Sequence, residues 1–197
     1  MPDRNMNRAR SIAVSLILIV FCVSLLPGCG GNTRLARQYC ENGDTWYQKA
    51  VVLGRKLTED EQQILKVMLA NDVPGLVALK GQLTDMIGDV DESLGYLEKA
   101  DDYYNKVLRL KDVPEYKQYA EIMREAVQKN KDSLTVGRQL ANSVMGIIQA
   151  AESGVPVDLQ AYVKSGSHTV NLLDQYVRTV IELETEARTY ATQHNLF

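Results

Sequence analysis

Apolar residues recur at alternating three- and four-residue steps through most of the chain after residue 33. This spacing places them on one face of an α-helix and differs from the two-residue alternation of a half-buried strand. The clearest stripe runs from Leu76 to Val107, and a second runs from Tyr116 to Ile148. The pattern predicts an all-α chain in which each helix buries one apolar stripe.

Three prolines, Pro74, Pro114 and Pro156, divide this region at intervals of 40 and 42 residues. Each follows a valine that is itself preceded by Asp or Gly. Proline is favoured in the first turn of a helix and disfavours helix at the residue before it, so each proline predicts a helix start. The expected helices cover about residues 33–70, 74–110, 114–152 and 156–193.

Four stripes of nearly equal length with short connections predict an antiparallel up-down bundle of four long helices. The same period is compatible with a solenoid of helical hairpins with a period near 40, if each segment breaks in its middle. Candidate breaks are the capping-box pattern at residues 58–61 and the Ser165-Gly166-Ser167 stretch. We favour the bundle, because the second segment has no polar break and the last stripe continues through Gly166. A kink near Thr58 is expected in either fold.

The first 28 residues follow a different pattern. A leader with three arginines precedes residues 11–26, of which 13 of 16 are apolar. This run is shorter than the roughly 20 residues that a membrane-spanning helix needs, and Pro27 and Gly28 end it. A basic leader, a short apolar run and a small-residue end predict a secretory signal peptide.

The end of this segment, Leu26-Pro27-Gly28-Cys29, resembles the lipobox of bacterial lipoproteins. Pro27 departs from the family pattern, which usually has a small or β-branched residue there. The resemblance implies cleavage between Gly28 and Cys29 and a diacylglyceryl group with further acylation, such as palmitate, on Cys29. Residues 1–28 are then a cleaved signal peptide, 29–32 a lipidated tether, 33–193 the helical domain and 194–197 a C-terminal tail. No family is recognised for the helical body.

Lipidation predicts a protein anchored to the cell membrane outside the cytoplasm, because two or more acyl chains give stable attachment. Gly30 and Gly31 follow the cysteine, where a retention signal of inner-membrane lipoproteins would have Asp. The resemblance therefore favours the periplasmic face of the outer membrane if the host has two membranes. After residue 28 the chain has 19 basic and 24 acidic side chains. This balance argues against nucleic acid as a partner.

The sequence contains no motif that points to catalysis, and no Cys or His pair has the spacing of metal ligands. We therefore expect no enzymatic activity, no metal and no cofactor other than the lipid on Cys29. His168 is predicted on the surface of the last helix and His194 in a frayed tail. Cys40 is expected to be a small buried residue, with an intermolecular disulfide as the alternative.

Two acids are expected close to the interior of the bundle. Counted from the turns, Asp101 and Glu184 fall at the same height beside their stripes, level with Arg124 and residues 40–44 and near Tyr104. Inward carboxylates without cations are costly, so either Arg124 or a ligand should reach them, unless they lie at an edge open to solvent. Asp101, Glu184, Arg124 and Tyr104 therefore form a candidate ligand pocket.

Gly81, Gly88 and Gly95 recur at seven-residue spacing opposite the stripe of their helix. Glycine weakens a helix, so three in line suggest a face that a partner helix approaches closely. An unconstrained surface is the alternative.

These observations favour a non-enzymatic, lipid-anchored helical interaction or scaffold domain of the cell envelope. Its partner would be another envelope protein or a second copy of the chain. The alternative is a sensor or carrier of a small polar ligand bound between the helices.

Overall fold

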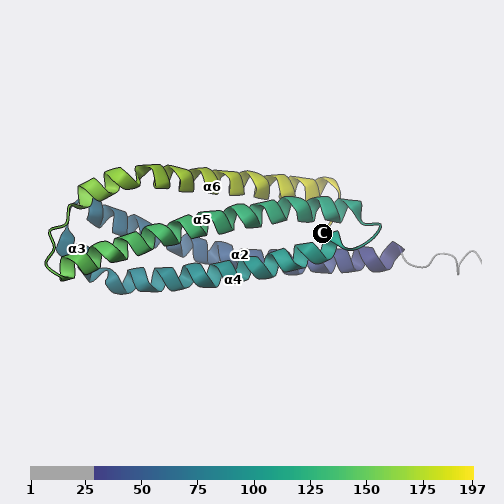
Figure 1. Ribbon diagram of the computed structural model, residues 1–197. Helices are drawn as coiled ribbons and strands as arrows, with labels where there is room; N and C mark the ends of the chain where they lie inside the picture. Colours follow the sequence, from purple (N-terminus) through teal and green to yellow (C-terminus); the bar gives the residue numbers. More distant parts are fainter. Residues whose placement is uncertain (1–28) are drawn as a thin grey trace, which may run out of the picture.

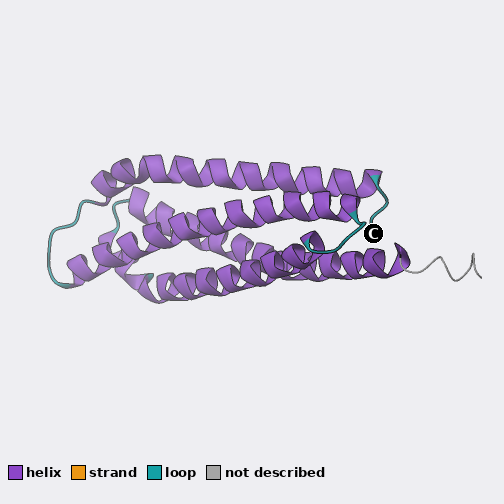
Figure 2. Ribbon diagram, turned by 45° about the vertical axis from the view of Figure 1, so that its right-hand side comes forward, coloured by secondary structure: helices purple, strands orange, loops and turns teal. Residues whose placement is uncertain are grey.

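The computed structural model describes residues 29–197, with side chains from residue 31 onwards. Its helices are α2 (Cys29–Leu69), α3 (Val73–Ala78), α4 (Lys80–Leu108), α5 (Pro114–Glu152) and α6 (Leu159–Gln193). Figure 2 shows that short loops at the two ends connect them. No strand occurs among the described residues, which confirms the predicted all-α class.

The four long helices run antiparallel, up and down, with α3 at the turn between α2 and α4 (Figure 1). Helix α2 continues through residues 58–61, and α6 continues through residues 165–167. The mid-segment breaks that a solenoid of hairpins requires are therefore absent from these two helices. The up-down bundle is confirmed, and at 1.5 Å per residue the 41-residue α2 is about 60 Å long.

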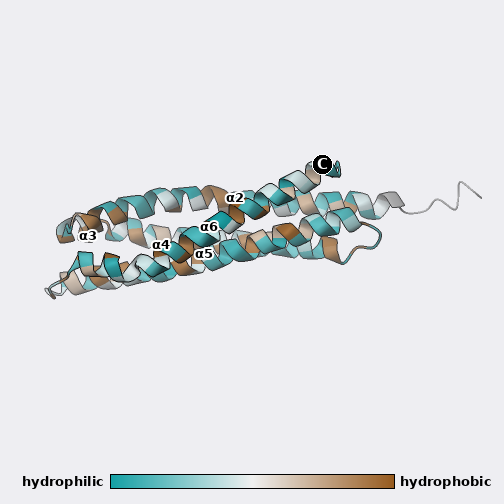
Figure 3. Cartoon of the chain, turned by 90° about the horizontal axis from the view of Figure 1, so that it is seen from above, coloured by the Kyte–Doolittle hydropathy of each residue, from teal (hydrophilic) through white to brown (hydrophobic). Residues whose placement is uncertain are grey.

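The helices pack unequally around the bundle. The extensive contacts are those of α2 with α4, α4 with α5 and α5 with α6, whereas α2 and α6 touch far less. In the view from above, α6 crosses the other helices obliquely (Figure 3). The bundle is therefore packed least tightly along the side between its first and last helices.

Each of the four long helices ends near a residue with positive φ: Asn71 at 54°, Asp112 at 58°, Gly154 at 75° and Asn195 at 49°. This left-handed conformation ends helices and is tolerated best by Gly, Asn and Asp. The prolines that follow the first three turns restart the chain after these caps. The period near forty in the sequence is therefore the repeat of a helix, its cap and a proline.

Some boundaries differ from the predicted ones. The second segment is divided at Leu79 into α3 and α4. Helix α6 begins at Leu159 instead of Pro156, because the Asp158 carboxylate caps it by accepting a hydrogen bond from the Ala161 N–H at 3.0 Å. Residues 29–32, the predicted tether, lie at the start of α2.

Among the four long helices, α6 contributes least to the core. Its buried residues are Leu159, Val180, Leu183 and Ala187, so 20 positions between the first two contain none. Large apolar side chains on α6 remain exposed instead, at 49% for Val170, 47% for Val177 and 56% for Ile181. Most of the core residues belong to α2, α4 and α5.

Candidate functional site

A cavity of about 440 Å³ lies between α2, α5 and α6, in the half of the bundle that contains the C-terminus. Three helices and the chain end contribute to its wall. Its principal lining side chains are Asp44, Tyr47, Tyr119, Met123, Glu184 and Phe197. The cavity thus occupies the side where the first and last helices make few contacts.

Asp44 of α2 is the most enclosed acid of this wall. One of its oxygens, Oδ1, accepts hydrogen bonds from the phenols of Tyr104 at 2.6 Å and Tyr119 at 2.8 Å. Burial raises the pKa of the Asp44 carboxyl above its ordinary value, and the two phenols partly oppose this shift because they stabilise the ionised form. Asp44 is therefore a carboxylate held in place by phenols, without an ion-pair partner.

Gly43 allows Tyr104 to reach Asp44. A Cβ atom at position 43 would lie 2.6 Å from Cε1 of the Tyr104 ring, which is closer than carbon atoms pack. The ring of this fully buried tyrosine therefore lies directly against the α2 backbone. The glycine brings α4 close enough for the Tyr104 hydroxyl to meet the neighbouring carboxylate.

Glu184 of α6 lies on the other side of the cavity. Its Oε1 atom accepts a hydrogen bond of 2.7 Å from the hydroxyl of Tyr47 on α2. Burial, followed by the charge of Glu184, raises the pKa of Tyr47, and Asn130 of α5 opposes the shift. This bond joins α2 and α6, which share few other contacts.

The predicted pocket residues separate into different groups. Asp101 lies with Arg124, at 2.8 Å between Oδ1 and Nε, and also accepts a hydrogen bond from Asn105 at 3.0 Å. Neither Asp101 nor Arg124 lines the cavity, so the prediction that they share a pocket with Glu184 is wrong. Asp101 and its cation neutralise each other across α4 and α5, whereas Glu184 faces α2.

The expected height of Asp44 relative to Glu184 agrees with the structure. Residues 40–44 were placed level with Glu184, and Asp44 lines the same cavity. Tyr104, a predicted pocket residue, does not line the cavity itself, but its hydroxyl donates a hydrogen bond to Asp44, which does. Tyr47 and Phe197 were missed. The available signal was the helical spacing of Tyr47, which lies on the buried stripe of α2 with Cys40 and Ala50.

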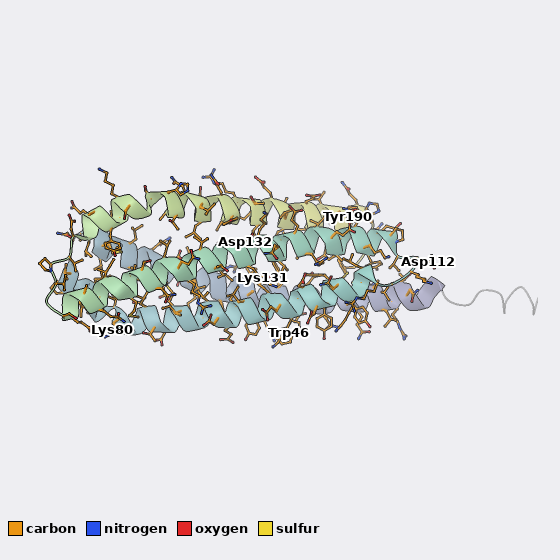
Figure 4. The ribbon with its side chains drawn as sticks, in the orientation of Figure 1. Trp46, Lys80, Asp112, Lys131, Asp132 and Tyr190 are labelled. Carbon is orange, nitrogen blue, oxygen red and sulfur yellow. The ribbon has the colours of Figure 1, made fainter. Side chains whose placement is uncertain are left out.

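The C-terminal tail forms part of the site and is not frayed. Leu196 is 3% exposed, and its carbonyl accepts a hydrogen bond of 2.7 Å from the Tyr116 hydroxyl. Phe197 packs edge-on against Tyr119, with ring centroids 5.1 Å apart. His194 stacks on Tyr190 at 4.3 Å between centroids, near the end of α6 (Figure 4). The tail thereby closes one end of the cavity.

The remaining candidate residues lie outside the cavity. A Cβ atom at Gly81, Gly88 or Gly95 would meet nothing within 4 Å, so this line of glycines faces open space on α4. Cys40 is fully buried and burial raises the pKa of its thiol, which matches the expected small core residue. His168 is exposed on α6, as predicted.

An aromatic and basic surface covers the outer side of α2 and α4 in the same half of the bundle. Trp46 and Tyr96 pack with ring centroids 5.6 Å apart, and Trp46 is labelled in Figure 4. The ammonium groups of Lys49 and Lys99 lie 3.9 and 4.3 Å from the Trp46 ring centroid. Of these cation–π contacts, the one from Lys99 to Trp46 connects α4 with α2 on the outside of the bundle.

The signal peptide and residues 26–28 of the lipobox lie outside the described residues, and the side chain of Cys29 is not described. Within residues 29–197, none of the helices combines the length and apolar character needed to cross a bilayer. In the same range, no three His, Cys, Asp or Glu side chains gather into a group able to hold a metal ion. Comparison with protein-family models, curated proteins and solved structures found no match to this chain.

Proposed function

We propose that the chain is a lipid-anchored protein of a bacterial cell envelope whose bundle binds a small polar ligand between α2, α5 and α6. The single observation that carries the ligand-binding part is the cavity of about 440 Å³ with Asp44 and Glu184 in its wall. Its size is typical of small-molecule sites, and its wall combines polar and charged side chains with apolar and aromatic ones. Nothing in this wall favours catalysis over binding.

The lipid anchor is supported by the lipobox that ends at Cys29. Helix α2 begins at that residue, and Asp44 lies 15 residues further on, about 22 Å along the helix. A lipidated Cys29 would therefore hold the cavity within a few tens of ångströms of the membrane surface. Gly30 and Gly31 favour the outer membrane in a host with two membranes.

Intact mass and membrane fractionation test the anchor. The chain isolated from its host should begin at Cys29 and carry diacyl or triacyl mass, and a Cys29→Ala variant should lack both the lipid and the membrane association. A wild-type chain that retains residues 1–28 without acyl mass would contradict the proposal.

A ligand panel tests the cavity. Cationic, anionic, zwitterionic and neutral small molecules are added to the purified full chain, and amide shifts are followed by NMR. Shifts centred on residues 44–48, 119–123 and 184–192, saturating with one class of compound, are expected. Shifts only elsewhere, or none with any class, would overturn the ligand-binding function.

An interaction domain is the second candidate, and the exposed apolar residues of α6 favour it. Val170 and Val177 lie seven residues apart on one face of the helix, with Ile181 beside them. Apolar surface of this kind often marks a protein contact. The partner would be an envelope protein or a second copy of the chain.

Site-specific photo-crosslinking in host membranes tests this candidate. A crosslinker at Val177 and one at Gly88 distinguish the α6 face from the glycine line of α4, and the exposed Gln175 serves as the control. A discrete crosslinked product that forms from Val177 or from Gly88, and does not form from Gln175, supports an interface at that position. Equal labelling at all three positions contradicts it.

A further inference from the structure

The charges around the cavity are not balanced by ion pairs. Asp44 and Glu184 come from different helices and face one space, yet neither takes part in any of the ion pairs formed among the described residues. Arg188, on the exposed side of α6, also lines this space. Two carboxylates and one guanidinium leave one negative charge in excess when both acids are ionised.

Each acid keeps one oxygen available. Both phenols donate to Oδ1 of Asp44, and Tyr47 donates to Oε1 of Glu184. The other oxygens, Oδ2 and Oε2, accept no hydrogen bond from residues 31–197. No polar side-chain atom in this range is both buried and without a partner, so these two oxygens reach solvent. They can accept hydrogen bonds from the N–H groups of a ligand.

The rest of the wall suits an organic cation. Phe197 presents an aromatic ring that is 46% exposed, and Tyr119, Met123 and the fully buried Tyr47 form the wall behind it. The edge-on packing of Phe197 against Tyr119 turns these two rings in different directions around the same end of the cavity. Aromatic faces attract ammonium groups, and the attraction is stronger when the cation is partly desolvated.

We infer that the cavity binds a small primary ammonium ion, held by Asp44 Oδ2 and Glu184 Oε2 with its alkyl part against the aromatic wall. One ammonium supplies the single positive charge and the N–H donors that the two acids lack. This assignment rests on the proposed ligand-binding function and specifies the chemical class of its ligand. Burial raises the pKa of Asp44, and a bound cation would offset this cost of ionisation.

The test is isothermal titration calorimetry of the full chain in mild detergent at pH 7.5. The probes are n-butylammonium, tetramethylammonium, butyrate and n-butanol, which separate charge, N–H donors and alkyl contact. We expect saturable one-site binding of n-butylammonium, with the other three probes weaker by roughly tenfold or more.

Three variants locate the site. Asp44→Asn and Glu184→Gln should each weaken n-butylammonium binding by roughly tenfold or more, because each removes a charged acceptor. Asp101→Asn is the matched control, because this acid is paired with Arg124 outside the cavity, and it should bind as the wild type does. Circular dichroism verifies that each variant folds. If Asp44→Asn does not fold, Glu184→Gln still tests the site, because its amide oxygen can accept the hydrogen bond from Tyr47.

Four results would overturn the inference. They are no saturable binding of n-butylammonium, equal binding of tetramethylammonium, unchanged binding by Glu184→Gln, or preferred binding of butyrate. Butyrate binding that Arg188→Gln abolishes would assign the cavity to an anion and would leave the proposed ligand-binding function intact. Failure of the whole ligand panel in the NMR experiment would remove that function as well.

Discussion

Asp44 shows how one side chain depends on its neighbours in the sequence and in space. The residue before it is a glycine, and the close approach of the Tyr104 ring to that glycine sets the hydrogen bond to the carboxylate. A second phenol, from Tyr119 on α5, meets the same oxygen. Three helices therefore meet at one carboxyl group, and substitutions there should affect both packing and ionisation.

The first prediction concerns Gly43. Gly43→Ala places a Cβ atom 2.6 Å from the Tyr104 ring, so the ring or a helix must move, and the free energy of unfolding should fall by about 1–3 kcal/mol. Urea denaturation measures this change. Gly54→Ala is the control in the same helix, because its Cβ meets nothing within 4 Å, and it should stabilise by about 0.5–1 kcal/mol. Equal effects of the two substitutions would contradict the role given to Gly43.

The second prediction concerns pH. Because burial raises the pKa of Asp44, the folded state binds a proton more readily than the unfolded state does. The wild type should therefore lose stability relative to Asp44→Asn as pH rises. The loss should begin near pH 4, about the pKa of Asp in an unfolded chain, and end above the pKa of Asp44 in the folded chain. Urea denaturation of both chains between pH 4 and 8 measures the difference, and a difference independent of pH would contradict it.

The phenols of the Asp44 cluster provide the control for this pH effect. Tyr119→Phe removes a hydrogen bond that lowers the pKa of Asp44, so the carboxyl should titrate at higher pH. Tyr103→Phe alters a phenol that packs on Tyr39 outside the cluster and should leave the titration unchanged. Carbon-13 NMR of the Asp44 carboxyl carbon reports both midpoints.

At the level of elements, α6 differs from the other three long helices. It has a capped start at Asp158, but between Leu159 and Val180 it buries no residue. A helix of this kind is held mainly at its two ends, since most helical stability in proteins comes from packing of an apolar face. The hydrogen bond from Tyr47 to Glu184 lies in its well-packed half.

The third prediction concerns local opening of this helix. Amides of residues 163–178 should exchange with deuterium roughly tenfold faster or more than those of residues 180–190, because fewer buried contacts oppose opening. Residues 116–127 of α5, where buried positions are frequent, serve as the slow reference. Hydrogen-exchange mass spectrometry measures all three segments, and uniform protection along α6 would contradict this view.

For the whole molecule, the C-terminus completes the bundle at the end where α2 begins (Figure 1). Leu196 is buried against the core, its carbonyl binds Tyr116, and Phe197 closes one end of the cavity. The last two residues of the chain therefore connect overall stability with the candidate ligand site.

The fourth prediction tests this connection. Leu196→Ala should lower the free energy of unfolding by about 2–5 kcal/mol, as for other buried leucines. Phe197→Ala should cost less, because its side chain is 46% exposed, but it should weaken n-butylammonium binding by removing part of the aromatic wall. Urea denaturation and calorimetry separate the two effects. A larger loss of stability from Phe197→Ala than from Leu196→Ala would contradict the assignment.

The secondary structure and the topology were predictable from local patterns. The stripes from Leu76 to Val107 and from Tyr116 to Ile148 indicate helices, and the prolines at 74 and 114 mark where α3 and α5 begin. These signals are local because helix periodicity, caps and prolines act within a few residues. The solvent-facing glycine line of α4 followed from the same periodicity.

The pairing of side chains across helices was decided only by the tertiary structure. Asp101 and Glu184 were predicted to share a pocket, but Asp101 turns to Arg124 and Glu184 turns to Tyr47. Which neighbour a residue beside the stripe meets depends on how each helix is rotated and on how closely two helices approach. These are properties of packing between distant segments, and no spacing within one helix contains them.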